Sequence, residues 1–324
     1  MKKKTFSGWT WITLACFLFF AVFFIYPISR IFLNSVYDFN TGTFSLKAFE
    51  KFFGKKYYTN TIWNSLKVTT CATVLACLFG TSLAYFARTI RIRGKRVLDI
   101  VMLISVLSPP FIGAYSWIVL LGRAGVITTV INRIFHITFN GIYGFSGILL
   151  VFTVKLSPLV YLYVSGALKN LDNSLNEAAE NMGCSGIKKM FTVILPLILP
   201  TVLASALLVF MRALADFGTP MLIGEGYRTL PELIYNSFIG EVSQDHSFAA
   251  AIAVVVVIFT TIIFLLQQWI SKKKNIEMSS MNPMEPRPVQ GVKNVLVHGY
   301  AYLFILLELL PIIVVAYNSF QNTS

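Results

Sequence analysis

The feature of this sequence that most limits its possible folds is a series of long apolar stretches, most of them without a charged side chain. A helix rises about 1.5 Å per residue, so about 20 apolar residues cross the roughly 30 Å hydrocarbon layer of a bilayer. Backbone groups in lipid must bond within their own segment, so each stretch is expected to be a helix. The uncharged stretches are Thr5–Ser29, Val68–Ala87, Ile100–Gly122, Met190–Met211 and Ser247–Ser271, and two more, Gly144–Leu168 and Asn294–Tyr317, contain Lys155 and Glu308.

The composition agrees with membrane insertion and not with a water-soluble fold. Of 324 residues, 56% are hydrophobic and 13% are charged, and the mean hydropathy is +0.70. Soluble domains carry about 25% charged residues, so this chain has too little polar surface to cover a soluble globule. A cytosolic enzyme, a secreted disulfide scaffold and a disordered tail are therefore excluded. We predict an all-α polytopic membrane protein.

Lysine and arginine are unevenly distributed between the two sets of connecting segments, which predicts the orientation of the chain. The richer set contains Lys2, Lys3, Lys4, Arg88, Arg91, Arg93, Lys95, Arg96, Lys169, Lys188, Lys189, Lys272, Lys273, Lys274, Arg287 and Lys293. The poorer set contains Lys47, Lys51, Lys55, Lys56, Arg123, Arg133 and Arg228. Because the richer set faces the cytoplasm, we expect a cytoplasmic N-terminus. This placement accounts for the net charge of +13 without a nucleic-acid partner.

A short pattern near the first stretch recurs near the last. Pro27-Ile28 followed by Asn34-Ser35 is matched, at the same spacing, by Pro311-Ile312 followed by Asn318-Ser319. Such a recurrence indicates an internal repeat. We therefore expect one complete six-helix unit plus the first helix of a second, in a piece of a longer, duplicated protein. The predicted regions are 1–58 (N-terminal helix and outer loop), 59–271 (core), 272–293 (polar cytoplasmic linker) and 294–324 (first helix of an incomplete second half).

The segment 169–192, between the fourth and fifth stretches, has its own helical pattern. Ser174 followed by Glu177 predicts a capping box at the start of a helix. An apolar stripe follows at helical spacing and consists of Leu175, Ala178, Ala179 and Met182. Gly183 can adopt the left-handed conformation that ends a helix, and a second helix is expected from about Ser185. The segment is therefore predicted to form a helix–glycine–helix elbow on the cytoplasmic face.

These residues resemble the EAA loop of binding-protein-dependent ABC importer permeases. The family pattern is E-A-A, three residues, G, nine residues and I-x-L-P, and this sequence departs from it only by valine at position 193. The resemblance covers about residues 60–271 and implies the type I permease fold. It also implies an elbow that docks on the ATP-hydrolysing subunit. The residues carried over are Glu177 as anchor, Ala178 and Ala179 for close packing, Gly183 for the turn, and Leu195 and Pro196 as the junction with the fifth helix.

Sequence features for ATP hydrolysis and solute capture are missing from this chain. No G-x4-G-K-S/T phosphate loop occurs, so the resemblance implies a separate ABC ATPase subunit dimer at the cytoplasmic face. The outer loops are too short for a solute-capture domain, which implies an external solute-binding protein. His136, His246 and His298 are scattered and show no metal-ligand spacing. No catalytic residue, cofactor or metal site is therefore predicted.

Charged residues inside the apolar stretches are candidates for a functional path, because a charge within a bilayer is costly unless it faces water or a partner. Lys155 lies near the middle of the fourth stretch, one turn from Pro158. Arg212 and Asp216 are four residues apart near the outer end of the fifth, a spacing that allows them to pair on one helix face. Two interpretations stay open: a structural ion pair with a lysine that reaches the interface, or the lining of a translocation cavity.

The segment after the fifth stretch bears on the transported solute. Asp216-Phe217-Gly218-Thr219-Pro220, with the later Leu230-Pro231 and Ile234-Tyr235, resembles the ferric-iron branch of these permeases. That branch commonly fuses two six-helix halves in one chain, so the resemblance implies ferric iron as the solute and a second permease half as a partner. Phosphonate, thiamine, polyamine and sugar-phosphate permeases carry similar segments, and these solutes remain alternatives.

Two other classes of membrane protein are possible interpretations of the same stretches. A self-contained secondary transporter or channel predicts charged relays in several spans, whereas three spans of the core have no charge. A signalling protein needs a cytoplasmic effector domain, and the longest expected cytoplasmic loop is residues 169–192. The sequence therefore predicts a multi-pass permease of the cell (inner) membrane, in contact with lipid on its outside, that is not itself an enzyme.

Overall fold

The structure is a computed structural model that describes residues 8–38, 42–184, 186–239, 245–272 and 286–320. In this part of the chain the helical segments long and apolar enough to cross a membrane are Gly8–Val36, Lys56–Thr89, Gly113–Phe135, Gly144–Lys169, Met190–Ala215, His246–Trp269 and Val292–Ser319. The chain divides into two compact units, residues 1–62 with 233–261, and residues 63–232 with 262–324. The predicted all-α membrane fold is confirmed.

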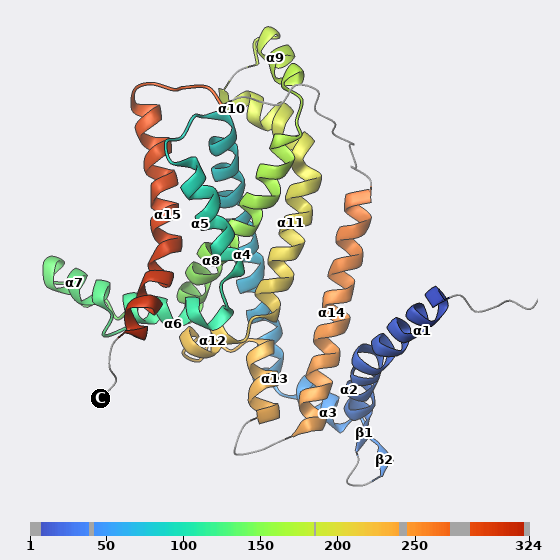
Figure 1. Cartoon of the computed structure of the whole chain (residues 1–324). Coiled ribbons are helices and arrows are strands. Elements are labelled where there is room, and N and C mark those ends of the chain that lie inside the picture. Colours follow the sequence, from blue (N-terminus) through green and yellow to red (C-terminus); the bar gives the residue numbers. More distant parts are fainter. Residues whose placement is uncertain (1–7, 39–41, 185, 240–244, 273–285, 321–324) are drawn as a thin grey trace, which may run out of the picture. The chain divides into compact units, whose positions relative to one another are not determined.

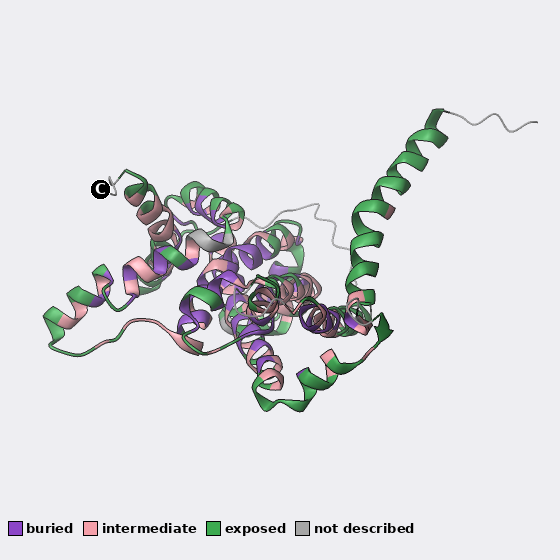
Figure 2. Cartoon of the chain, turned by 90° about the horizontal axis from the view of Figure 1, so that it is seen from below, coloured by how far each residue is buried: buried purple, intermediate pink, exposed green. Residues whose placement is uncertain are grey.

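The first unit begins with a long apolar helix. α1 (Gly8–Phe20), a π-helical segment (Ala21–Ile25) and α2 (Tyr26–Val36) follow one another without a break. α1 has no buried residue, and Figure 2 shows it exposed along its length. The π-helical turn directly precedes the α2 turn that contains Pro27. Proline lacks an amide hydrogen and its ring crowds the carbonyl four residues earlier, and a wider turn relieves this conflict.

The rest of the first unit surrounds a small aromatic cluster. Its elements are β1 (Tyr37–Asp38), antiparallel β2 (Thr43–Phe44), α3 (Lys47–Gly54), most of α13 (Leu230–Ile239) and the first part of α14 (His246–Lys272). Phe52 is fully buried, and its ring centroid lies 6.4 Å from those of Tyr58 and Phe248. Lys51 Nζ lies 2.7 Å from Asp245 Oδ2. These contacts hold α3 against the start of α14.

Five long helices form the bundle of the second unit. They are α4 (Lys56–Thr89, from Trp63 onward), α5 (Lys95–Leu107), α8 (Gly144–Lys169), α11 (Leu195–Ala215) and α15 (Val292–Ser319). Figure 1 shows them side by side. The buried core takes side chains from every one of them, including Leu83, Leu98, Phe152, Ile198 and Phe304. α15, the helix predicted to open a second half, is therefore part of the same core as the helices of the first half.

α4 and α8 approach each other closely at Gly80. A β-carbon added to Gly80 would lie 2.7 Å from both the Ser157 carbonyl oxygen and Val160 Cβ. Small residues allow this kind of backbone approach between membrane helices. On the α8 side, Pro158 removes one amide donor from the helix, and the Ser157 hydroxyl donates to the Thr153 carbonyl at 2.6 Å. The crossing therefore requires glycine in α4.

Short helices lie at the two ends of this bundle. α6 (Pro110–Leu121), α7 (Val126–Phe135) and α12 (Gly218–Ile223) lie at one end. α9 (Asn173–Asn181) and α10 (Gly186–Lys189) lie at the other (Figure 1). We call the second of these the α9 end.

The predicted third span, Ile100–Gly122, is wrong as a single helix. α5 stops at Leu107, Ser108 and Pro109 are extended, and α6 starts at Pro110 in a different direction (Figure 1). A proline disfavours helical geometry in the residue before it, and proline is well suited to the first position of a helix. α5 alone covers about 20 Å at 1.5 Å per residue, so the two consecutive prolines place a break within the bundle.

Both copies of the repeated pattern lie at the end of a helix. α2 ends at Val36, one residue after Ser35, and α15 ends at Ser319. The Ser35 hydroxyl donates to the Phe32 carbonyl at 2.7 Å, and the Ser319 hydroxyl donates to the Ala316 carbonyl at 2.7 Å. Ser29, Ser82 and Ser205 make the same bond within other helical turns, and the residues that follow the two helices differ, Tyr37 being extended and Phe320 helical. The internal repeat therefore stays a prediction from the sequence.

Candidate functional site

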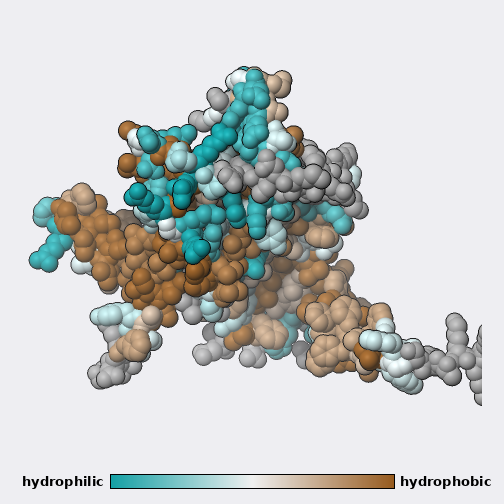
Figure 3. All heavy atoms as spheres, turned by 45° about the horizontal axis from the view of Figure 1, so that its top comes forward, coloured by the Kyte–Doolittle hydropathy of each residue, from teal (hydrophilic) through white to brown (hydrophobic). Residues whose placement is uncertain are grey.

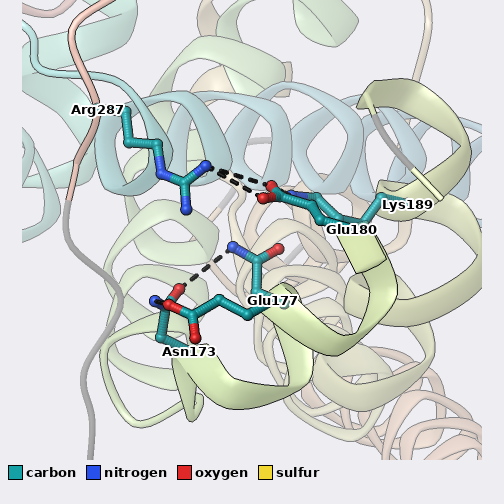
Figure 4. Close-up of polar contacts among 6 residues, drawn as sticks. Asn173, Glu177, Glu180, Lys189 and Arg287 are labelled. Atoms are coloured by element: carbon teal, nitrogen blue, oxygen red, sulfur yellow. Dashed lines mark hydrogen bonds and ion pairs between the residues drawn. The ribbon is translucent and has the colours of Figure 1, made fainter. Parts of the chain in front are cut away.

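α9 begins earlier than predicted, and a different side chain caps it. Asp172 precedes the helix, and its Oδ1 accepts a hydrogen bond from the Ser174 amide at 2.9 Å. Glu177 accepts a hydrogen bond from Asn173 Nδ2 at 2.7 Å (Figure 4). The predicted capping box of Ser174 and Glu177 is wrong, because the Asp172 carboxylate supplies the capping oxygen and places Ser174 inside the helix.

Gly183 ends α9 as predicted. Its φ is +75°, in the left-handed region that favours glycine. The Gly183 amide donates to the Glu180 carbonyl at 2.9 Å and the Cys184 amide donates to the Ala179 carbonyl at 2.9 Å. These two bonds form a Schellman motif, which satisfies carbonyls at the helix end and reverses the chain. α10 starts at Gly186, so the predicted helix–glycine–helix elbow is confirmed. Ser185, the predicted start, lies outside the described residues.

The two sides of α9 differ in exposure. Ala179 and Asn176 are buried. Leu175 is 47% exposed, Met182 is 87% exposed, and Ala178 is exposed between them. We call Leu175, Ala178 and Met182 the exposed stripe. Figure 3 shows hydrophilic side chains gathered over the α9 end and hydrophobic ones over the helices below it. The exposed stripe is thus a short apolar surface within a polar region.

The side chain of Glu180 lies between two cations from different parts of the chain. Lys189 Nζ lies 2.6 Å from Glu180 Oε1, and Arg287 Nη1 lies 3.2 Å from Glu180 Oε2 (Figure 4). The hydrogen bond from Lys189, followed by that from Arg287, holds the pKa of the Glu180 carboxyl below its ordinary value. The two cations therefore favour the ionised form of Glu180.

Leu195 and Pro196 lie where the elbow joins the bundle. α10 continues through a π-helical segment (Met190–Ile194) into α11, and Pro196 follows that segment as Pro27 follows the first one. Ile194 is buried and Leu195 packs against the core of the second unit. No loop separates α10 from α11, so the elbow and this helix of the bundle form one continuous helical segment.

A cavity with several charged side chains on its wall lies in the bundle between α5, α8 and α11. Its volume is about 310 Å³, and it is lined by Ser105, Val106, Ser108, Lys155, Leu156, Arg212, Ala215 and Asp216. Lys155 Nζ lies 2.5 Å from Asp216 Oδ2, and the Asp216 side chain is only 7% exposed. The structure therefore brings together three of the four predicted path residues, Lys155, Arg212 and Asp216. The fourth, Pro158, is buried in α8 and is not among the lining residues.

The predicted pairing of Arg212 with Asp216 on one helix face is wrong. α11 ends at Ala215, so Asp216 lies outside the helix. The spacing of four residues therefore does not place Asp216 on one helix face with Arg212. The Asp216 carboxylate turns to Lys155, and it also accepts hydrogen bonds from the Thr219 amide at 2.9 Å and the Thr219 hydroxyl at 3.2 Å. It thus fixes the start of α12 and joins α8 to the end of α11.

α15 contributes a buried acid that sequence analysis leaves unassigned. Glu308 is 5% exposed and lies with Lys155 and Ser105 on the wall of a second cavity of about 30 Å³. Lys155 and Ser105 line both cavities, so each cavity contains one acid and shares the same lysine. In the part of the chain that the structure describes, no group of three His, Cys, Asp or Glu side chains is placed to hold a metal ion.

The profile of a known protein family matches residues 72–276, which is more than half of the chain. That family is described as "Binding-protein-dependent transport system inner membrane component". The chain belongs to this family. The matched part of the chain contains α8, the elbow and α11. The resemblance drawn from the EAA loop is thereby confirmed.

Two relatives of this inner membrane component differ in the solutes that they are named for. It is 27% identical, over 79% of its length, to the ferric transport system permease protein FbpB of Actinobacillus pleuropneumoniae, and the matched part covers 37% of that relative. It is 29% identical, over 64% of its length, to the molybdenum transport system permease protein ModB of Escherichia coli (strain K12), covering 91% of that relative. The chain therefore spans well under half of the ferric relative.

A solved structure shares the fold of this inner membrane component. A chain of a bacterial alginate ABC transporter, crystallised in complex with an alginate pentasaccharide-bound periplasmic protein, superposes with a TM-score of 0.68. The identity is 15%, and the likeness covers 81% of this chain and 93% of the other. The predicted fold, an ABC importer transmembrane domain, is confirmed.

Four residues around the sites have no site role assigned from the sequence: Asp172, Glu180, Arg287 and Glu308. Asp172 could have been found, because aspartate is a preferred N-cap residue and stands directly before the helix. Glu180 and Arg287 carry no local signal, since they come together from segments distant in the sequence. Glu308 is visible as a charge inside an apolar stretch, but its neighbours on the cavity wall come from other helices. Charge alone does not identify such residues.

Proposed function

We propose that this chain is the transmembrane permease part of an ATP-binding-cassette importer, with no catalytic role of its own. It forms a path for a solute that an external binding protein delivers, and a separate ABC ATPase subunit dimer hydrolyses ATP. The family and the fold support this assignment. The second permease half is supplied by the repeat that α15 opens or by another copy.

The α9 end and the N-terminus are proposed to face the cytoplasm. Ten basic residues of the richer set that the structure describes in the second unit lie at or between helix ends that meet at the α9 end: Arg88, Arg91, Arg93, Lys95, Arg96, Lys169, Lys188, Lys189, Arg287 and Lys293. This agrees with the positive-inside rule, and it places the elbow where an ATPase subunit can reach it.

The exposed stripe is the observation that carries the coupling proposal. Leu175, Ala178 and Met182 present apolar surface on a helix that is otherwise polar, and Gly183 fixes the direction of that helix. Ala178 has a small side chain, so a groove on a partner can approach the backbone of α9 closely. Glu177, also exposed, adds a carboxylate beside the stripe. Ala179, Leu195 and Pro196 act by joining α9 to the bundle.

Copurification of the ATPase subunit with affinity-tagged permease tests this assignment. Glu177→Lys, Ala178→Arg and Gly183→Trp are each expected to reduce copurification about tenfold or more while membrane insertion is retained. Val292→Arg is the matched control, because Val292 is an exposed apolar residue at the same end of the bundle outside α9. If the three elbow variants copurify the ATPase subunit as well as the unmodified permease does, the proposed coupling role of the elbow is wrong.

The cavity between α5, α8 and α11 is proposed to be part of the translocation path. Lys155, Arg212 and Asp216 supply charges that a solute or its hydration water can meet within the bundle. Pro158 contributes indirectly, because it lies on α8 beside the crossing with Gly80. The break at Ser108 and Pro109 lies in the same region, since Ser108 lines this cavity.

Ferric iron is the solute that we propose. The ferric permease relatives and the segment from Asp216 to Pro220 support it. The molybdenum relative and the segment's likeness to phosphonate, thiamine, polyamine and sugar-phosphate permeases define the alternatives. Isolation of the partner binding protein followed by mass spectrometry and metal analysis of its ligand tests the proposal. Bound ferric iron is expected, whereas bound molybdate, phosphonate or polyamine would overturn it.

A further inference from the structure

The segment that leads into α15 is attached to the start of the α4–α5 connection by its main chain. The Arg287 amide donates to the Thr89 carbonyl at 3.0 Å, and the Arg91 amide donates to the Arg287 carbonyl at 3.1 Å. These two bonds form a parallel bridge between Ile90 and Arg287. The position of Arg287 is therefore set by the backbone, whatever its side chain does.

The helix that follows is attached to the same connection. The Arg93 amide donates to His298 Nε2 at 3.1 Å, and the Tyr302 hydroxyl donates to the Arg93 carbonyl at 3.1 Å. His298 and Tyr302 lie on the first turns of α15. The end of the linker, the α4–α5 connection and the start of α15 therefore form one hydrogen-bonded group.

From this group the Arg287 side chain reaches the elbow. Its Nη1 lies 3.2 Å from Glu180 Oε2 and 3.5 Å from Glu180 Oε1, across 107 residues of sequence (Figure 4). The Schellman motif at Gly183 uses the Glu180 carbonyl, so Glu180 belongs to the turn that directs α9. Lys189 of α10 binds the same carboxylate. One carboxylate thus connects both arms of the elbow to the segment before α15.

We propose that Arg287 is a positioning residue for the coupling elbow, through which the linker before the second half holds α9 in the orientation that the ATPase subunit meets. This inference rests on the proposed function. We name the contact between Arg287 and Glu180 the linker latch. Because the latch is an ion pair with a 60% exposed arginine side chain, its effect is modest and weakens as salt screens it.

Titration of the complete permease in proteoliposomes with purified ATPase subunit tests the latch. Arg287→Ala is expected to raise the ATPase-subunit concentration for half-maximal ATP hydrolysis about two- to fivefold and to leave the maximal rate unchanged. Arg287→Lys keeps the charge and is expected to stay within about 1.5-fold of the unmodified protein. Arg93→Ala is the matched control, since the Arg93 side chain is exposed and its main-chain bonds are retained.

High salt provides a second measurement. The difference between Arg287→Ala and the unmodified protein is expected to disappear at about 1 M salt, where the Debye length is about 3 Å. The latch is overturned if Arg287→Ala behaves like Arg93→Ala, or if it lowers only the maximal rate, which would indicate loss of folded protein. Loss of copurification in the Gly183→Trp variant together with a silent Arg287→Ala would leave the coupling proposal intact and remove the latch alone.

Discussion

At the scale of single residues, the pair of Lys155 and Asp216 has a double role. Asp216 binds the lysine of α8 and also accepts hydrogen bonds from Thr219 in the first turn of α12. Each charge is therefore held by a partner from a different element. Removal of the lysine leaves the largely buried Asp216 carboxylate without its cation, with only the hydrogen bonds from Thr219, and this is more costly than replacement of both partners.

Lys155→Met is expected to destabilise the permease by about 3 kcal/mol, measured as a fall in the midpoint of thermal unfolding in detergent. Arg212→Met is the control, because it removes a cation from the same cavity at an exposed position and is expected to change stability by less than about 0.5 kcal/mol. Adding Asp216→Asn to Lys155→Met is expected to recover at least half of the loss. A double variant as unstable as the sum of the single ones would contradict the pairing.

At the scale of helices, proline and glycine decide where regular geometry is altered. Both π-helical segments, Ala21–Ile25 and Met190–Ile194, end two residues before a proline. The extended residues Ser108 and Pro109 separate α5 from α6 for a related reason. Glycine acts in two different ways, because Gly183 is required for its backbone angle and Gly80 for the space between α4 and α8.

Gly80→Ala is expected to destabilise the protein by about 1 to 3 kcal/mol, because the added methyl group overlaps the α8 backbone. Gly166→Ala is the matched control. Gly166 is a helical glycine of α8 with nothing within 4 Å of an added β-carbon, and alanine there is expected to be neutral or to stabilise the helix by up to about 1 kcal/mol. Thermal unfolding of the two purified variants measures the difference. Equal stability of the two variants would show that the crossing is not tightly packed.

At the scale of the whole molecule, the prediction concerns membrane topology. In a variant without the four native cysteines, a cysteine at position 188 is expected to react with a membrane-impermeant maleimide only after right-side-out vesicles are opened. A cysteine at position 47 is expected to react in closed vesicles. Lys188 and Lys47 are both exposed, so neither result depends on burial. The reverse pattern would invert the orientation and place the elbow out of reach of a cytoplasmic ATPase.

The sequence alone determined the membrane class, the positions of most spans and the elbow at Gly183. These features follow from local physics: the length of uncharged apolar runs, the helical period and the backbone freedom of glycine. The family resemblance added the expected fold and a partner at the elbow. The spans and the elbow each depend on residues within a few helical turns of one another, so they can be predicted from the order of residues alone.

The tertiary structure decided which charges meet. Asp216 pairs with Lys155 and not with Arg212 because α11 stops one residue before it. Arg287 reaches Glu180, and Glu308 shares a cavity with Lys155, only because distant helices pack side by side. Such partners depend on where separate helices come together in space, and no local pattern of residues contains that information.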